Sequence, residues 1–349
     1  MTKKLTQKQL ADLGAELDQI RADAIESVDD TDKRYIKRVV RCKQFLEIAG
    51  RCMIHFSFTP IGVGFGAVIL SVSKTLDNME IGHNVLHGQY DWMDDSNINS
   101  KKYELDFLVD SRSWKKTHNR EHHNYTNIIG KDRDYGYATL RLSQDIPWSF
   151  KWRFNLLYLF ILSLFFQWGV GLHEMEIEKV RAGKTTYKKK WPVMKAFLRK
   201  GFKQLLKDYV IFPLISWPFY WKIIIGNLIA NALRNVWVSS TIFCGHLSEN
   251  VETFTESECE KETRGQWYYR QLLGSSNFKC CKLIHILSGH LGFQIEHHLF
   301  PSVPSRRYPE IAPKVESVCK KYGLKYNTGS LAMQYCSVLK KVWHHSKPI

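Results

Sequence analysis

Long apolar stretches recur along this chain of 349 residues, and they constrain its fold more than any other feature of the sequence. They occupy residues 42–58, 60–80, 153–172, 208–225 and 227–246. Segments of about 17–20 residues are long enough to cross the hydrocarbon core of a bilayer as helices. An apolar content of 44% also excludes a disordered chain. The sequence therefore predicts an all-α, polytopic helical bundle in a membrane.

The basic residues indicate how these stretches are placed. Residues 179–207 are crowded with Lys and Arg, and basic loops between spans stay on the cytosolic side. The stretch 153–172 then cannot be a simple crossing, and we expect it to lie at the cytosolic interface or to dip into it. The other four stretches remain as crossings. Glu47, Arg51 and His55 share one face of the first, so a soluble amphipathic helix is the alternative there.

We expect three parts: a polar and basic cytosolic segment (1–41), a membrane domain (42–330) and a basic tail (331–349). No signal peptide is recognisable at the start of the chain. The eight cysteines form no CxxC pair, which is typical of reduced thiols in a cytosol-facing protein. Fifty Lys and Arg against 34 Asp and Glu suit anionic lipid headgroups. No helix-turn-helix, zinc-finger or RNA-binding signature accompanies this charge, so nucleic acid is not an expected partner.

The histidines carry the chemistry, and the first two windows lie before the middle of the chain. His83 and His87 are one helical turn apart, a spacing that lets two imidazoles share one transition metal. Alone, this spacing is also common among surface residues. His118 and His122 again share one helical face, while His123 points about 100° away and suits a second metal centre. A chance cluster or a zinc site is the alternative for this second window.

The third window holds His297 and His298, which we expect to bind metal. Gln294 lies one helical turn before them and His290 lies one turn before Gln294, so these side chains form a stripe. These two either bind metal as well or hold the ligands in place by hydrogen bonds. His246 ends an apolar stretch, where ligation and an ordinary interfacial or core position are equally supported.

An even number of crossings returns the chain to the same side, so all these windows can meet at one face. The candidate ligands are His83, His87, His118, His122, His123, His246, His297 and His298. Eight imidazoles exceed the roughly four to six positions around one ion, so two ions are implied. Nitrogen donors suit iron, zinc or copper, and they disfavour calcium and magnesium. A pair of redox metals beside an apolar cavity suggests oxidation of a lipophilic substrate.

Over about residues 40–330 the sequence resembles the integral-membrane fatty acid desaturases with three histidine boxes. The resemblance lies in HNVLH at 83–87, HNREHH at 118–123 and QIEHHLFP at 294–301. The last run is similar to the front-end and bacterial acyl desaturase branch, and ETRGQWY at 262–268 is similar to bacterial acyl-CoA desaturases.

The resemblance implies a cytosol-facing helical cap with two iron ions held by the eight histidines. Such a centre activates dioxygen and inserts a cis double bond into a long-chain acyl substrate, as a CoA thioester or a lipid. It also implies a multi-pass protein of a bacterial inner membrane. Two positions depart from the family pattern: Asn84 stands where many relatives have Asp, and Ile242 stands where some relatives have Asn.

The expected reaction needs two electrons that this chain cannot supply. It has no fused haem domain, and the run GVGFG at 62–66 is not a dinucleotide fingerprint. Instead, these small residues suit close packing of helices. We expect a separate NAD(P)H-dependent reductase and a small electron carrier. A fatty acid hydroxylase, an oxidative decarboxylase that makes terminal alkenes, and a non-catalytic metal-binding membrane protein are the alternatives.

Charged residues near the boxes are further candidates. Asp132 and Asp134 either accept hydrogen bonds from the histidines or form a structural turn. A set of basic residues either grips the phosphates of a thioester or a lipid headgroup, or forms a solvated basic face. These are Arg112, Lys115, Lys116, Arg306 and Arg307.

Overall fold

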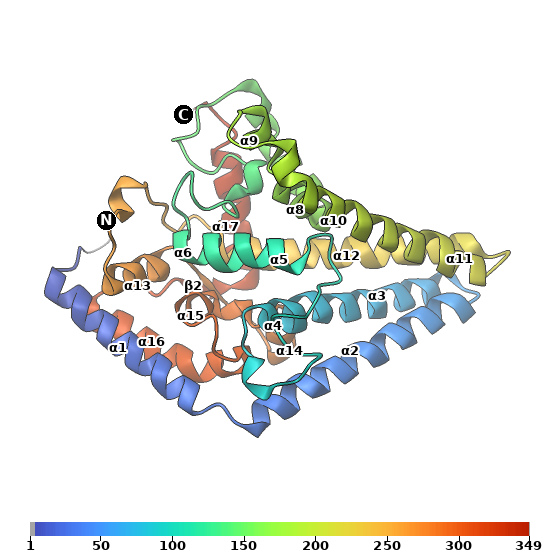
Figure 1. Ribbon diagram of the computed structural model, residues 1–349, viewed down its shortest axis with the longest axis horizontal. Coiled ribbons are helices and arrows are strands. Elements are labelled where there is room, and N and C mark those ends of the chain that lie inside the picture. Colours follow the sequence, from blue (N-terminus) through green and yellow to red (C-terminus); the bar gives the residue numbers. More distant parts are fainter. Residues whose placement is uncertain (1–3, 349) are drawn as a thin grey trace.

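The computed structural model describes residues 4–348, and almost all of its regular structure is helical (Figure 1). The helices are α1 (Gln7–Glu26), α2 (Asp30–Phe56), α3 (Pro60–Leu76), α4 (Asn84–Leu86), α5 (Ser111–Trp114), α6 (His123–Tyr125), α7 (Asn155–Leu164), α8 (Phe166–Glu174), α9 (Ile177–Arg181), α10 (Tyr187–Leu206), α11 (Phe212–Ile215), α12 (Tyr220–His246), α13 (Arg264–Leu273), α14 (Lys282–Leu287), α15 (Gln294–Leu299), α16 (Tyr308–Tyr322) and α17 (Leu331–His344). Strands β1 (Asn277–Lys279) and β2 (Thr328–Ser330) pair in parallel.

Wider, π-helical turns interrupt the helices at three places. They are Asp77–His83, Lys115–His122 and Lys207–Ile211. The first joins α3 to α4, the second joins α5 to α6, and the third joins α10 to α11. Such turns are rare and occur frequently at functional sites. Two of the three here contain histidines of the boxes: His83 lies in the first, and His118 and His122 lie in the second.

The long helices α2, α3, α12 and the run α10–α11 converge on one end of the molecule, which tapers to the right in Figure 1. The close approach of α2 to α3 rests on Gly50 and Gly66. A Cβ atom on Gly50 would lie 2.7 Å from the backbone nitrogen of Leu70, and one on Gly66 would lie 2.9 Å from that of Ile54. Gly66 thus has the packing role that the sequence predicts for its run of small residues, whereas a Cβ on Gly64 would meet nothing.

At the other end, short helices form a cap around the histidines. Helix α1 packs against α13 and α16, and their apolar side chains share one core that also includes α15. Helix α17, from the segment predicted as a tail, packs against α7 and α12 through the buried side chains of Val338 and Val342.

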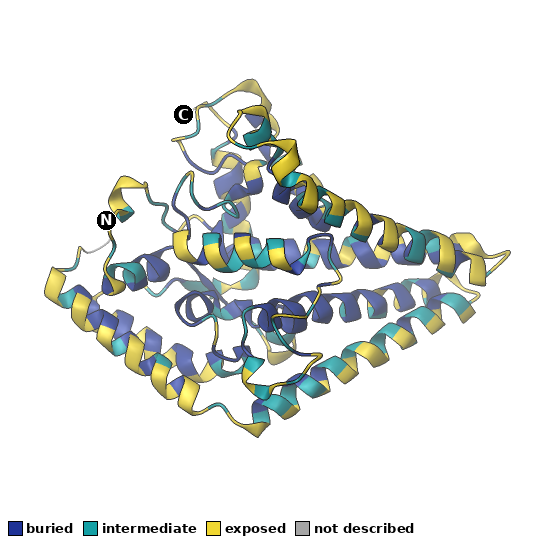
Figure 2. Cartoon of the chain, viewed as in Figure 1, coloured by how far each residue is buried: buried dark blue, intermediate teal, exposed yellow. Residues whose placement is uncertain are grey.

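The tapered end exposes large apolar side chains, as the exposed residues along α2 and α10 illustrate in Figure 2. Phe56, Phe58 and Trp217 are 75%, 87% and 72% exposed. Within residues 4–348, no single helix is both long and apolar enough to cross a membrane. The pair Phe150–Leu164 and Phe166–Arg181 meets the requirement jointly, by length and composition, with a bend of 98° between its helices.

The second half of the bundle differs from the sequence prediction. The basic segment 179–207 is largely the helix α10, which runs on through Lys207–Ile211 and α11. The chain turns after Ile215, and α12 begins at Tyr220, so residues 208–225 do not form one helix. Pro218 explains the position of the turn. Proline has no amide hydrogen and its ring clashes with the backbone of the preceding turn, so one helix cannot continue from Ile215 through this residue.

Candidate metal centre

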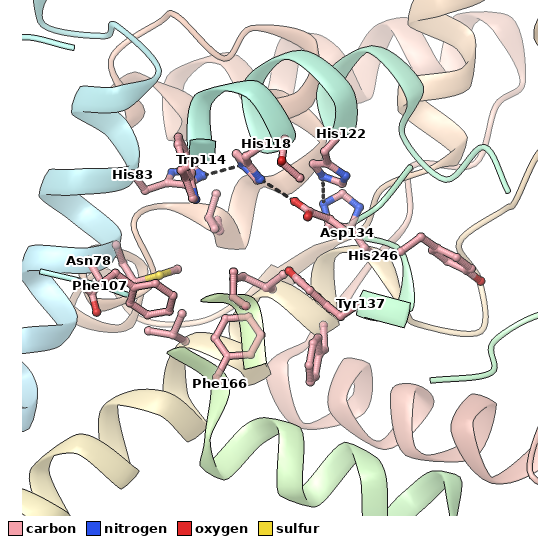
Figure 3. Close-up of a pocket in the computed structure, with 18 of the residues that line it drawn as sticks. Asn78, His83, Phe107, Trp114, His118, His122, Asp134, Tyr137, Phe166 and His246 are labelled. Carbon is pink, nitrogen blue, oxygen red and sulfur yellow. Dashed lines mark hydrogen bonds and ion pairs between the residues drawn. The ribbon is translucent and has the colours of Figure 1, made fainter. Parts of the chain in front are cut away.

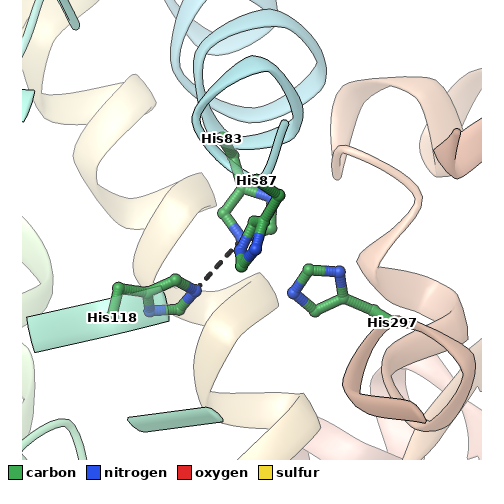
Figure 4. A group of neighbouring side chains, drawn as sticks. All are labelled: His83, His87, His118 and His297. Atoms are coloured by element: carbon green, nitrogen blue, oxygen red, sulfur yellow. Dashed lines mark hydrogen bonds between the residues drawn. The ribbon is translucent and has the colours of Figure 1, made fainter. Parts of the chain in front are cut away.

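The histidine boxes meet inside the cap, and two groups of imidazoles form there. The first group contains His83, His87, His118 and His297, each of which places a ring nitrogen within 4.8 Å of those of the others (Figure 4). The Nε2 atoms of His83 and His118 are 3.3 Å apart. His87 and His118 are partly exposed, whereas His83 and His297 are buried.

The second group contains His122, His246 and His298, and all three are buried. The Nε2 atom of His246 lies 3.3 Å from that of His122 and 3.0 Å from that of His298. The side-chain amide of Gln294 lies 2.8 Å from the same His246 atom. It approaches closely because residue 245 is glycine: a Cβ there would lie 2.7 Å from Cγ of Gln294.

His123 lies between the two groups. Its ring stacks on that of His298 with centroids 4.3 Å apart, and the ring of His87 is 4.7 Å away on another side. His290 lies apart from both groups. It adopts a left-handed backbone conformation, with φ 56°, and its Nδ1 lies 2.9 Å from the Glu80 carboxylate. The predicted stripe of His290, Gln294 and the box is therefore broken, because a helical turn is not continuous across residues 290–294.

Hydrogen bonds hold five of the imidazoles with Nδ1 away from the groups. Asp134 accepts from His118 at 2.9 Å, and Asp132 accepts from His122 with both oxygens at 3.0 Å. The other three acceptors are Asn84 Oδ1 for His83 (3.2 Å), Gln271 Oε1 for His298 (3.0 Å) and the Tyr308 hydroxyl for His297 (3.3 Å). A hydrogen on Nδ1 leaves the lone pair on Nε2, and a neutral imidazole in that form is a metal ligand.

The electrostatics agree with this arrangement. Burial lowers the pKa of His83 to about 3 and lowers those of His87, His297 and His298 well below the usual value, so these rings are neutral. Burial acts to raise the pKa of the Asp134 carboxyl, but the hydrogen bond from His118 and the nearby imidazoles outweigh it and lower the pKa. The carboxylate is therefore ionised and orients the imidazole.

Several buried nitrogens have no hydrogen-bond partner among the described residues. They are Nε2 of His87, Nε2 of His297, Nδ1 of His246 and both nitrogens of His123. Leaving such groups unsatisfied costs about 1–3 kcal/mol each. Two nitrogens bound to one ion at about 2.1 Å and at right angles lie about 3.0 Å apart, close to the spacing seen within both groups. The donor set therefore fits metal ions.

A cavity with an empty volume of about 920 Å³ adjoins both groups (Figure 3). His83, His118, His122 and His246 line one side of it. Much of the remaining lining is apolar or aromatic, with Phe107, Tyr137, Phe166, Val170, Val238, Ile242, Phe243 and Leu291. Glu174 also lines the cavity, and burial raises its pKa to about 7. The site thus places a mostly apolar space against the imidazoles.

Sequence reasoning missed several residues of this site. Gln271 and Tyr308 orient His298 and His297, and Trp114 stacks on His118 with ring centroids 4.5 Å apart. Gln271 and Tyr308 have no spacing relative to the boxes that reveals them, whereas Trp114 precedes His118 by one helical turn. Two predicted candidates lie elsewhere: both Arg306 and Arg307 form ion pairs with Asp32.

Comparison with known proteins places the chain in a family. The sequence profile described as "Fatty acid desaturase" matches residues 59–330. The chain is 42% identical over 335 residues to the NADPH-dependent stearoyl-CoA 9-desaturase of Mycobacterium tuberculosis, covering 95% of this chain and 78% of that protein. It is 26% identical to the sn-1 linoleoyl-lipid 6-desaturase of Synechocystis sp., over 75% of this chain and 74% of that one. The chain therefore belongs to the fatty acid desaturase family and is an oxygen-dependent oxidoreductase.

Proposed function

We propose that this protein desaturates long-chain acyl-CoA thioesters with dioxygen and two electrons at a pair of iron ions. The observation that carries the proposal is the convergence of two imidazole groups on one apolar cavity. The CoA thioester is inferred from the 42% identical mycobacterial protein, whose name specifies stearoyl-CoA. Its name also specifies NADPH, which supports a separate NADPH-dependent reductase and a small electron carrier as partners.

In this proposal His83, His87, His118 and His297 hold one iron, and His122, His246 and His298 hold the other. Gln294 lies beside His246 of the second group and would lie near its ion, and His123 lies between the two groups. When bound, the two ions supply the chemistry that reduces dioxygen and removes two hydrogens from the acyl chain. Asp132 and Asp134 keep the Nδ1 hydrogens of His122 and His118, so that the Nε2 lone pairs remain directed at the ions.

The cavity holds the acyl chain and excludes water from it. Phe166 and Phe243 pack edge to face beneath the cavity, and Tyr137 packs against Phe166 in the same way. These rings fix the wall opposite the imidazoles, so one pair of methylene groups is held against the metal groups. The wall therefore determines which carbons react.

The proposal also includes membrane insertion with the cap on the cytosolic side. The family supports membrane attachment, and so do the exposed apolar side chains at the tapered end. We propose four spans, formed by α2, α3, the run through α11, and α12, with α7 and α8 bent at the interface. Lys222, near the tapered end, donates hydrogen bonds to the backbone oxygens of His55 and Ser57, which satisfies its charge at the turn.

The test is a fatty acid profile with double-bond location by mass spectrometry. The native protein and a His122→Ala variant are expressed in a host that supplies a compatible reductase and carrier. We expect one new cis alkene at one position, absent from the variant. A hydroxylated acid would mean that the protein is a fatty acid hydroxylase, and a terminal alkene would mean that it is an oxidative decarboxylase. No new product from an iron-loaded protein reduced by its carrier would contradict the proposal.

A further inference from the structure

The helical segment that carries the second histidine box has two different faces. Its inner face presents Thr117, His118 and His122 to the metal groups. Arg112, Lys116 and Arg120 are exposed and lie four residues apart, so they form one basic stripe on the outer face. Figure 2 shows exposed residues along this segment on the side turned to the viewer, at the position of α5 and α6 in Figure 1.

Further positive charge lies beside this stripe. The Lys115 ammonium donates a hydrogen bond to the backbone oxygen of Ser100 at 2.7 Å, which holds the exposed pair Lys101 and Lys102 next to the segment. Lys116 is 58% exposed and has one carboxylate nearby, that of Glu121 at 3.5 Å. Among the described residues, Arg112 and Arg120 form no ion pair. The surface is therefore free to attract an acidic partner.

Trp114 connects this surface to the metal groups. Its ring is partly exposed, stacks on His118 at 4.5 Å between centroids, and lies 5.6 and 5.5 Å from the rings of His83 and His87. The first histidine group is also the more accessible one, because His87 and His118 are partly exposed while all three histidines of the second group are buried. This corner therefore offers electrons from outside a route to the first group.

Resting on the proposed function, we propose that this basic stripe is the docking surface for the electron donor, a small redox protein with an acidic face around its cofactor. The partner binds against Arg112, Lys116 and Arg120, and Trp114 lies between its cofactor and the first histidine group. Each turnover oxidises two reduced carriers by one electron each. These two electrons, two protons from water and two hydrogens from the acyl chain convert one dioxygen to two water molecules, and the acyl chain gains one C=C bond.

Binding without turnover tests the proposal. The probe is an oxidised plant-type [2Fe–2S] ferredoxin, which is a small acidic protein, added to the metal-loaded full chain in detergent at low ionic strength. The triple variant Arg112→Glu, Lys116→Glu, Arg120→Glu should raise the Kd for ferredoxin at least about tenfold. The difference should shrink in 0.5 M salt, where the screening length falls to about 4 Å. No measurable binding to the native chain, or no loss in the variant, would overturn the proposal.

The chain offers a matched control on the cap. Lys314, Lys320 and Lys325 are exposed, and the variant in which all three are changed to Glu has the same net charge as the test variant. Its Kd should stay within about twofold of the native value, because these lysines lie on and after α16, away from the stripe. An equal loss in both variants would mean a general charge effect and would overturn the assignment of the surface. If charge reversal prevents folding, the milder triple variant Arg112→Gln, Lys116→Gln, Arg120→Gln replaces it. This variant should lose less affinity for ferredoxin.

Two further readouts separate this proposal from its competitors. If the stripe binds the phosphates of the CoA thioester instead, the test variant raises the KM for acyl-CoA and leaves ferredoxin binding intact, which overturns the docking proposal. A Trp114→Leu variant should bind ferredoxin normally but slow the reoxidation of the reduced form. If only the desaturase proposal is wrong, native protein still binds and oxidises reduced ferredoxin but forms no alkene.

Discussion

The two histidine groups differ in exposure, although neighbouring residues supply both. The first group has four histidines, two of them partly exposed, and Trp114 beside it. The second has three histidines, all buried, and the amide of Gln294 in place of a fourth ring. One group therefore faces the surface of the cap, and the other faces its interior.

Shared helices explain why the two groups remain close despite this difference. His297 joins the first group and its neighbour His298 joins the second, because consecutive residues on α15 point about 100° apart. His118 and His122 are likewise divided between the groups, and their rings stack at 5.1 Å between centroids. Movement of either segment thus disturbs both groups, whereas the segments that carry His83 and His246 each supply one group alone. This difference makes the groups separable by mutation.

The largest expected effect comes from removing a histidine that belongs to one group. His83→Ala should empty the first group and His246→Ala the second, so that each variant falls from about two iron ions per chain to about one. Desaturation should fall below detection in both, because the proposed reaction needs both ions. Iron analysis of the purified protein and product analysis by mass spectrometry check this prediction.

His290→Ala is the control for these variants. This histidine lies near the third box but bonds Glu80 instead of facing either group, so the variant should keep both ions. Loss of both ions in His83→Ala would contradict two separable groups, and loss of an ion in His290→Ala would contradict the division described above.

A smaller effect should follow from the carboxylates that orient one imidazole in each group. Asp132 accepts from His122 with both oxygens and also accepts the backbone amides of Asn127 and Asp134. Asp134 makes a single bond to His118 and is partly exposed. Asp132→Asn should therefore reduce activity by about 100-fold and Asp134→Asn by about tenfold. Product formation per bound iron is the measurement. An equal loss of activity in the two variants would contradict this distinction between the groups.

The sequence predicts which residues meet but not how they are divided. The spacing and number of the histidines predict two metals, and the eight candidate ligands lie together in the structure. The division between the groups depends on the π-helical turns at 77–83 and 115–122, which hydrophobic periodicity does not reveal. Gln271 and Tyr308 are brought to the site by tertiary packing from α13 and α16, and their spacing relative to the boxes carries no signal.

The same limit applies to the fold. The long apolar stretches predict an all-helical chain, and the structure turns polar residues of 227–246 inward: Arg234 is buried and donates to Asn78 and Gln167. The helix boundaries in the second half were wrong, because an average over residues 208–225 hides the turn at Pro218. Proline was the local signal that marked the break.

Gln294 allows a finer test of the second group. Gln294→Ala should lower the iron content of the second group and reduce activity by up to about tenfold, whereas Gln294→His should retain both, because a fourth imidazole replaces the amide. Gln334→Ala is the matched control, since this buried glutamine bonds the backbone oxygen of Asn277 away from both groups. Iron content is measured beside thermal stability. An equal loss of iron in the control would mean that the effect of residue 294 is not local.

The smallest expected effect is a difference in acid sensitivity of the metal-free protein. Burial lowers the pKa of His87 in the first group, so this ring stays neutral in the fold while the unfolded chain binds a proton below about pH 6.5. Burial also acts to lower the pKa of His122 in the second group, but the charge and hydrogen bond of Asp132 outweigh it and raise the pKa. His87 therefore costs stability as pH falls through the usual histidine range, whereas His122 adds stability that is fully present below that range and is lost as pH rises through its folded value.

Replacing each histidine by glutamine separates these contributions. Between pH 7 and 5.5, His87→Gln should make the fall in Tm of the metal-free protein shallower, and His122→Gln should make it steeper. Each linked proton is worth about 1.4 kcal/mol per pH unit, or roughly 2–4 °C in Tm. Scanning fluorimetry in detergent follows the change. Parallel shifts of the two variants would mean that Asp132 does not distinguish the second group electrostatically, and the comparison of the groups would then rest on exposure alone.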